Sequence, residues 1–138
     1  MKAKINTFVP ETKINKMNTT LWIIQGILAA MFLMAGLTKS TQSLEKLLKS
    51  GLAWAERYPM STVRFIGVSE LLGGLGLILP GLLGFYPILT PLSASALSLV
   101  MILAMLHHNK HKETKAIAFN LVLLLLAAFV AYGRFSTL

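Results

Sequence analysis

Residues Thr62–Gly81 read TVRFIGVSELLGGLGLILPG, a largely apolar run that is about long enough to cross a bilayer as one helix. The run carries one carboxylate, Glu70, near its middle. On a helix, one face of this run collects Val63, Gly67, Glu70, Gly74 and Leu77. Charged groups at this depth are costly and face other helices or a wet cavity, and glycines let a second helix approach closely. We therefore expect Glu70 to point at neighbouring helices and not at lipid.

The composition of the whole chain indicates an integral membrane protein. Of its 138 residues, 55% are hydrophobic and only 13% are charged, whereas charged residues make up about a quarter of a typical soluble domain. The apolar residues fall in long runs and not in the alternation typical of strands. Because short hydrophobic helices bury their polar faces only against one another, the sequence predicts one all-α domain, an integral membrane four-helix bundle.

Four spans are predicted inside a transmembrane domain that covers residues 19–134. They lie at about residues 21–37, 62–80, 87–106 and 116–132, with a polar basic tail over 1–18 and a short tail over 135–138. No small-residue cleavage site follows the first span, so we expect a retained helix and not a signal peptide. Thr19 or Thr20 is the expected N-cap of this span, and Gln25 is expected to make an interhelical hydrogen bond.

Residues 43–58, SLEKLLKSGLAWAERY, connect the first two spans and are too charged to cross the membrane. Apolar residues recur at the helical period on one side of this segment, and charged residues occupy the other side. The pattern predicts one amphipathic interfacial helix. The alternative is that the helix folds over the bundle as a lid. Pro59 is expected to end it, because the residue before a proline disfavours the helical conformation.

Polar side chains are expected to gather at one end of the bundle, where up-and-down threading brings the ends of spans one and three to the starts of spans two and four. The side chains collected there are Lys39, Arg64, His107, His108 and Asn120. Glu70 lies at mid-depth below them, so a cavity opening at this end is the expected ligand site. The opposite half of the bundle offers only Gln25, Ser93 and Ser95. The candidate ligand-binding residues are Glu70, Lys39, Arg64, His107 and Asn120.

Glu70 has two interpretations. As a functional group it carries a proton or anchors a ligand, and as a structural group, neutral or paired, it ties helices together. Arg64 lies six residues away on a different face of the same helix, so it is not an obvious partner. A partner for Glu70 is expected from Lys39, His107 or Asn120.

The sequence gives little support to catalysis, metal binding or nucleic-acid binding. The chain has no cysteine, which excludes disulfides, thiolate metal sites and thiol redox chemistry by this chain alone, and it has no aspartate for a Ser-His-Asp triad. His107 and His111 have the spacing of a metal pair, but no third ligand beyond Glu113 is evident. The net charge of +8 comes from lysines scattered over tails and connections, which favours membrane lipids as partners. We expect no catalytic residues, no metal site and no nucleic-acid partner.

Two stretches resemble the DoxX-like family of membrane proteins. Residues Gly67–Pro80, with their glutamate among glycines, resemble the second helix of that family, and residues Phe32–Lys39 resemble the end of its first helix. The order of one span, an amphipathic connection, a glycine-rich span and two further spans is similar too, over roughly residues 20–134. The resemblance implies a four-helix integral membrane protein. It also implies that Lys39 and Glu70 are the positions of this chain that match the functional residues of the family.

The family is named after a subunit of a thiosulfate:quinone oxidoreductase, and its animal relatives include a chaperone for the assembly of nicotinic receptors. The resemblance does not imply an oxidoreductase here, because the chain has no cysteine and no recognisable haem or flavin site. We expect a multi-pass protein of a bacterial cell (inner) membrane, an accessory or assembly protein that holds a lipid or quinone-like molecule near Glu70. A membrane protein or a second copy of the chain is the expected partner.

Two alternative functions remain open. The first is a quinone-binding accessory subunit of a membrane oxidoreductase, and the second is a small proton-coupled transporter. Four short helices enclose little volume, which counts against a monomeric transporter.

Overall fold

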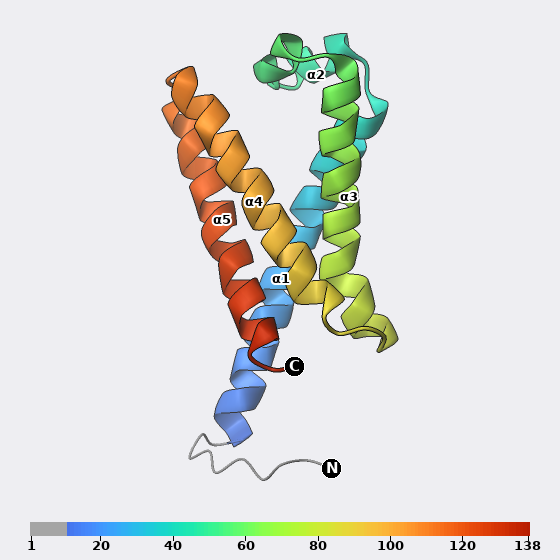
Figure 1. The fold of residues 1–138 in the computed structure, drawn as a ribbon, viewed down its shortest axis with the longest axis vertical. Coiled ribbons are helices and arrows are strands. Elements are labelled where there is room, and N and C mark those ends of the chain that lie inside the picture. Colours follow the sequence, from blue (N-terminus) through green and yellow to red (C-terminus); the bar gives the residue numbers. More distant parts are fainter. Residues whose placement is uncertain (1–10) are drawn as a thin grey trace.

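The computed structural model describes residues 11–138, and this part of the chain is helical without strands (Figure 1). Its elements in chain order are α1 (Glu11–Thr41), α2 (Leu44–Lys49), the 3-10 helix η1 (Ala53–Arg57), α3 (Met60–Leu83), α4 (Leu89–Lys110) and α5 (Thr114–Phe135). Four of them, α1, α3, α4 and α5, are long and apolar enough to cross a membrane. The predicted all-α fold with four spans is therefore confirmed.

Helix α1 begins well before the predicted first span. The hydroxyls of Thr19 and Thr20 donate to the carbonyls one turn earlier, those of Asn15 and Lys16, so both threonines lie inside the helix. The prediction that one of them is the N-cap was wrong, because threonine can also satisfy its hydroxyl against its own helix. Residues 11–18 of the expected tail continue α1, and residues 1–10 of that tail lie outside the described residues.

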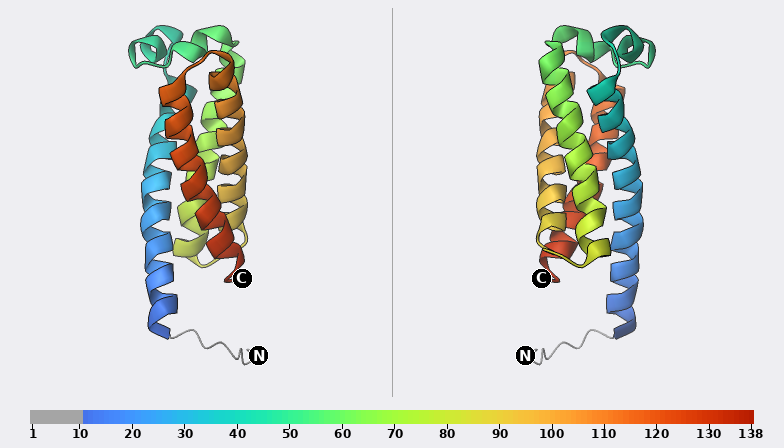
Figure 2. Two further views of the ribbon diagram at one scale, coloured as in Figure 1. Left: turned by 90° about the vertical axis from the view of Figure 1, so that its left-hand side faces the viewer. Right: turned by 90° about the vertical axis from the view of Figure 1, so that its right-hand side faces the viewer.

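The four long helices form two antiparallel pairs, α1 with α3 and α4 with α5. The pairs also touch each other through α3 against α4 and through α1 against α5. They lie close together at the end where the chain terminates and diverge toward the end that carries α2 (Figure 1). In the perpendicular views the α2–η1 segment lies across the end of the bundle far from the C-terminus (Figure 2). This connection therefore covers the end at which the pairs diverge.

The glycine-rich face of α3 is buried as predicted. Its buried residues are Val63, Gly67, Glu70, Gly73, Gly74, Leu77 and Pro80. Helices α1 and α3 touch through their backbones: a Cβ on Gly67 would lie 2.7 Å from the backbone nitrogen of Ser40, and a Cβ on Gly36 would lie 2.6 Å from the carbonyl oxygen of Gly67. The missing side chains therefore permit the close approach typical of membrane helix interfaces.

The apolar core lies between the helices, and large apolar side chains also cover the outside. Fully or almost fully buried members of the core include Leu28, Phe32, Leu77, Leu97 and Val130. Phe65 on α3 and Leu125 on α5 are 73% and 61% exposed, as expected for side chains that face lipid tails. In water such a surface would be an aggregation hazard, so the exposed side chains agree with a membrane environment.

The segment between α1 and α3 is not one helix, and that prediction was wrong. Helix α2 ends at Lys49, Gly51 takes a φ of +90°, and the chain resumes as η1. This left-handed backbone favours glycine and interrupts the helix. Leu47 and Ala55, from the two short helices, pack with Val63 of α3 in a small core of their own. The segment is thus fixed against the start of α3.

Candidate functional site

Lys39 and Glu70 form an ion pair inside the bundle. The Nζ atom of Lys39, in the last turn of α1, lies 2.9 and 2.8 Å from the two carboxylate oxygens of Glu70 in α3. The side chains are 12% and 4% exposed. Gly67 makes room for the pair, because a Cβ there would lie 2.8 Å from the Cβ of Lys39. Of the three partners considered for Glu70, the structure therefore assigns Lys39.

Trp54 of η1 covers the Lys39–Glu70 pair. Lys39 Nζ lies 5.7 Å from the centre of the Trp54 ring, within the range of a cation–π interaction. The same ring packs edge-on against Tyr58 and His107, with ring centres 6.0 and 6.5 Å away. Trp54 therefore connects the pair, which α1 and α3 contribute, to the end of α4.

A hydroxyl without a partner lies beside the pair. Ser40 directly follows Lys39, and its Oγ atom is buried without a hydrogen-bond partner among the residues that the structure describes. It lies 2.7 Å from the position that a Cβ on Gly67 would take. A buried hydroxyl ordinarily bonds to protein or to a bound molecule, so this one offers a free donor and acceptor next to the ion pair.

Arg64 fixes the backbone around Lys39 and does not contact the carboxylate of Glu70 through a hydrogen bond. Its Nη1 atom donates to the carbonyl oxygens of Lys39 and Gln42, at 2.8 and 2.5 Å. These carbonyls lie at the C-terminal end of α1, where the helix leaves them without internal partners. Arg64 therefore caps α1 and positions Lys39.

Neither His107 nor Asn120 is hydrogen-bonded to the Lys39–Glu70 pair in the described structure. His107 directly follows the predicted third span of residues 87–106, and the structure places it in the last turn of α4. Its Nε2 lies 3.2 Å from Arg57 Nη1, and its Nδ1 lies 2.7 Å from the Tyr58 hydroxyl. Because arginine only donates, Nε2 accepts, which leaves the proton of a neutral ring on Nδ1. Asn120 donates to the carbonyl of Ala116 in its own helix, and no hydrogen bond in the described structure brings it to the pair.

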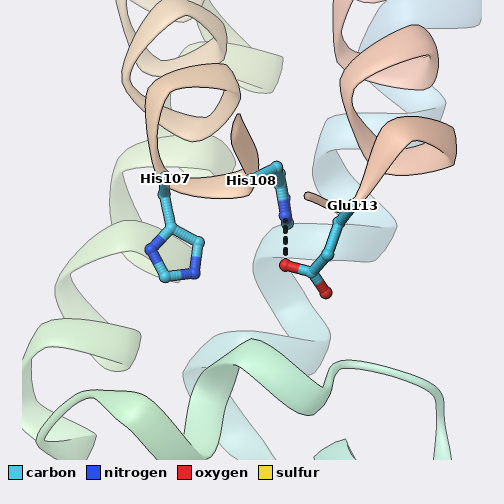
Figure 3. Close-up of side chains that lie close together, drawn as sticks. All are labelled: His107, His108 and Glu113. Atoms are coloured by element: carbon cyan, nitrogen blue, oxygen red, sulfur yellow. Dashed lines mark hydrogen bonds and ion pairs between the residues drawn. The ribbon is translucent and has the colours of Figure 1, made fainter. Parts of the chain in front are cut away.

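A second polar cluster lies where α4 passes into α5, and it consists of His107, His108, Glu113 and Arg57. Figure 3 shows the imidazole of His108 facing the carboxylate of Glu113, with Nδ1 and Oε1 3.1 Å apart. Arg57 Nη1 donates to the same oxygen at 3.2 Å. The hydrogen bond from His108, followed by the bond and charge of Arg57, holds the pKa of Glu113 below its ordinary value.

The ligand atoms of His107, His108 and Glu113 lie within 4.8 Å of one another, which is close enough for a shared metal ion. Arg57 opposes such an ion, because its Nη1 lies 3.2 Å from both His107 Nε2 and Glu113 Oε1. A guanidinium always carries a positive charge in proteins. The arrangement favours an ion-pair network that fastens η1 to the end of α4 over a metal centre.

Sequence reasoning missed a polar network at the opposite end of the bundle. Arg134 belongs to α5, and its Nε donates to Gln25 Oε1 at 2.6 Å while Nη1 donates to Asn18 Oδ1 at 2.7 Å. Gln25 Nε2 donates to the carbonyl of Leu77 in α3 at 2.6 Å, so its predicted interhelical bond is confirmed. The expectation that this half offers only Gln25 and two serines was wrong. Arg134 and Gln25 are 109 positions apart, and no local sequence signal pairs them.

A shallow depression of about 270 Å³ lies on the outside of the bundle between α3 and α4, away from the ion pair. Ser69, Gly73 and Ser93 contribute to its lining together with apolar side chains. Its lining is mainly apolar and includes exposed leucines of both helices.

Comparison with known proteins gives one match. The sequence model of the DoxX-like family matches residues 23–130, which is most of the chain and includes Lys39 and Glu70. No curated protein and no solved structure matches the chain.

Proposed function

Because this chain belongs to the DoxX-like family of small multi-pass membrane proteins, we propose that it is an accessory or assembly protein holding one small ligand at the Lys39–Glu70 pair. The proposed ligand is a lipid or a quinone-like molecule. The proposed location is a bacterial cell (inner) membrane, and the proposed partner is another membrane protein or a second copy of the chain. The observation that carries the proposal is an ion pair buried among apolar helices.

The energetics of buried ion pairs support a role beyond stability. The free energy needed to remove two charges from water can exceed the energy of their mutual attraction. A protein in which well-packed apolar residues replace a buried ion pair is therefore often as stable as the original, or more stable. An ionisable pair at membrane depth therefore points to use of its charges. Lys39 supplies a donor for a carbonyl or phosphate oxygen, and Glu70 accepts from a hydroxyl or exchanges a proton.

The surroundings of the pair favour a ligand with a flat or acyl body and a polar end. Trp54 presents an aromatic face over Lys39, and the next residue in the chain, Ser40, has a buried hydroxyl without a partner among the described residues. A quinone ring stacks on such a face while its carbonyl reaches the ammonium group. This observation favours the quinone-binding subunit as the second candidate function. The transporter alternative requires a path for the substrate through the protein, and four short helices enclose little volume for one.

Native mass spectrometry of the gently purified protein tests the proposal, together with lipid extraction and an absorption spectrum. The wild type should retain one small molecule, and Lys39→Met and Glu70→Gln should each lose it. Glu45→Gln is the matched control, because Glu45 forms an exposed pair with Lys49 in which both side chains are at least 75% exposed.

The identity of the retained molecule separates the candidate functions. A quinone absorption band supports the oxidoreductase subunit, and a stoichiometric lipid supports the accessory protein. Proton-coupled uptake into liposomes that depends on Glu70 would move the assignment to a transporter. A wild type without a bound molecule, or variants that keep it, would contradict a ligand site at this pair.

A further inference from the structure

We propose a second site at the end of the bundle opposite the Lys39–Glu70 pair, where Arg134 binds a phosphate group. The phosphate belongs to an acidic phospholipid headgroup or is free inorganic phosphate. The site is independent of the proposed function, because it shares no residue with the Lys39–Glu70 pair. It is also independent of the family assignment, because the match ends at residue 130, before Arg134.

Hydrogen bonds from two of its nitrogens hold the guanidinium of Arg134 in one orientation. The Nε and Nη1 atoms donate to Gln25 and Asn18 of α1, and Cζ lies 5.3 Å from the centre of the Trp22 ring. Gln25 is itself fixed by its bond to the carbonyl of Leu77. Helix α1, which Gln25 ties to α3, therefore fixes this arginine, and a ligand that binds it does not have to order a flexible side chain.

The third nitrogen of the same guanidinium donates no hydrogen bond to the described part of the protein. Arg134 Nη2 is enclosed and has no hydrogen-bond partner in the described part of the chain. Among the carboxylates whose side chains the structure describes, none forms an ion pair with Arg134. Arg134 is half-buried, but an enclosed N–H donor of a charged group is costly unless an acceptor is supplied. An anion bound here would supply both the acceptor and the counter-charge.

A pocket of about 120 Å³ has Arg134 in its lining. Its lining includes Trp22 and Gln25 of α1, Thr90 in the first turn of α4, and Thr137 after α5. A single water needs only about 10–15 Å³ of such volume, so the pocket has room for a tetrahedral anion. The hydroxyl groups of Thr90 and Thr137 in the lining are suited to its oxygens, and the N-terminal end of α4 adds the positive end of a helix dipole.

Phosphate is the anion that best fits this chemistry. Charge-assisted hydrogen bonds from a guanidinium to a phosphate oxygen are strong, and Nη2 is the nitrogen of Arg134 that remains free to donate one. Arg134 is in the last turn of α5, at the end of a membrane-length helix, where phospholipid headgroups supply phosphate at high local concentration. The apolar side of the pocket, formed by Trp22, Pro87 and Leu138, suits the glycerol and first methylenes of a lipid.

The test uses delipidated full-length protein titrated with phosphatidylglycerol or phosphatidylcholine and read by native mass spectrometry. A parallel thermal melt in detergent uses inorganic phosphate. The variants are Arg134→Gln and Arg134→Lys, with Thr90→Val as a milder change in the pocket lining. Lys110→Gln is the matched control, because it removes one positive charge from an exposed position at the other end of α4.

Wild type and Lys110→Gln should bind phosphatidylglycerol more tightly than phosphatidylcholine, and Arg134→Gln should bind it roughly tenfold more weakly. Arg134→Lys keeps the charge but cannot hold Gln25, Asn18 and a phosphate together, so it should bind the lipid weakly too. If Arg134→Gln does not fold, Arg134→Lys and Thr90→Val carry the comparison.

The two sources of phosphate give different results. A rise in melting temperature with inorganic phosphate that disappears in the Arg134 variants assigns the site to free phosphate. Protection by the lipid alone assigns it to a headgroup. Equal binding of phosphatidylglycerol by wild type and by the folded Arg134 and Thr90 variants, with no phosphate effect, would overturn the proposal and leave Arg134 as a structural tie between helices.

Discussion

Removing one partner of the Lys39–Glu70 pair should destabilise the protein more than removing both. The two side chains are 12% and 4% exposed, so either single substitution leaves a charge in the bundle without its counter-charge. Breaking a buried pair in this way costs about 3–5 kcal/mol, whereas replacing both partners by apolar residues is about neutral or stabilises by about 1–4 kcal/mol. We therefore expect Lys39→Met and Glu70→Leu each to lose about 3–5 kcal/mol, and the double variant to recover most of that loss.

The assay is reversible unfolding in mixed detergent micelles, followed by circular dichroism, for the wild type, both single variants and the double variant. The four free energies form a double-mutant cycle whose coupling energy should reach several kcal/mol, with the double variant more stable than either single one. Glu45→Leu in the exposed pair with Lys49 is the control and should lose less than about 1 kcal/mol. A double variant whose loss equals the sum of the single losses would refute the reasoning.

Three further predictions concern the helix contact, the second polar cluster and the covering segment. In the same unfolding assay, Gly67→Ala should lower the free energy of unfolding by about 1–3 kcal/mol, because its Cβ would meet the backbone of α1. The Cβ of the control Gly26→Ala meets nothing within 4 Å, so that variant should lose no stability and should gain up to about 1 kcal/mol. Equal effects of the two substitutions would contradict the predicted contact. Because the pKa of Glu113 is lower in the folded than in the unfolded protein, its ionised carboxylate stabilises the fold fully above the unfolded pKa of about 4.3. This stabilisation is lost as the pH falls through the folded pKa. Thermal melts between pH 6 and 3 should therefore show a fall in melting temperature that is smaller in Glu113→Gln. Gly51→Val should lower the free energy of unfolding by about 1–3 kcal/mol, because valine is strained at a φ of +90°. The change should also expose Trp54, which covers the Lys39–Glu70 pair, and shift its fluorescence spectrum. An unshifted spectrum would contradict the covering role of Trp54.

The sequence predicted those features that depend on composition and on the helical period. Long apolar runs define the four spans, and the spacing of Gly67, Glu70 and Gly74 places them on one buried face. The sequence also predicts Lys39 as one of three possible partners of Glu70, because threading brings the end of the first span to the second. The sequence does not decide among these three partners, because the choice depends on where α1 and α3 cross. In the structure their backbones are in close contact at Gly36.

The remaining features depend on tertiary contacts or on a single backbone angle. An amphipathic pattern runs through Gly51, but the left-handed φ of that glycine interrupts the segment between α2 and η1. The bond between Arg134 and Gln25 requires α1 and α5 to lie side by side in one vertical register. The period of either helix carries no information on that register, so the second polar network was found only in the structure.

The central claim is that Lys39 and Glu70 are retained to bind a ligand and not to hold the fold together. The most direct measurement is native mass spectrometry of the Lys39→Met/Glu70→Leu double variant beside the wild type, after unfolding has shown the variant to be folded. Our account predicts a wild type that carries one small molecule and an equally folded double variant that carries none. The same molecule bound to the double variant in the same amount, or a wild type that binds nothing, would contradict it.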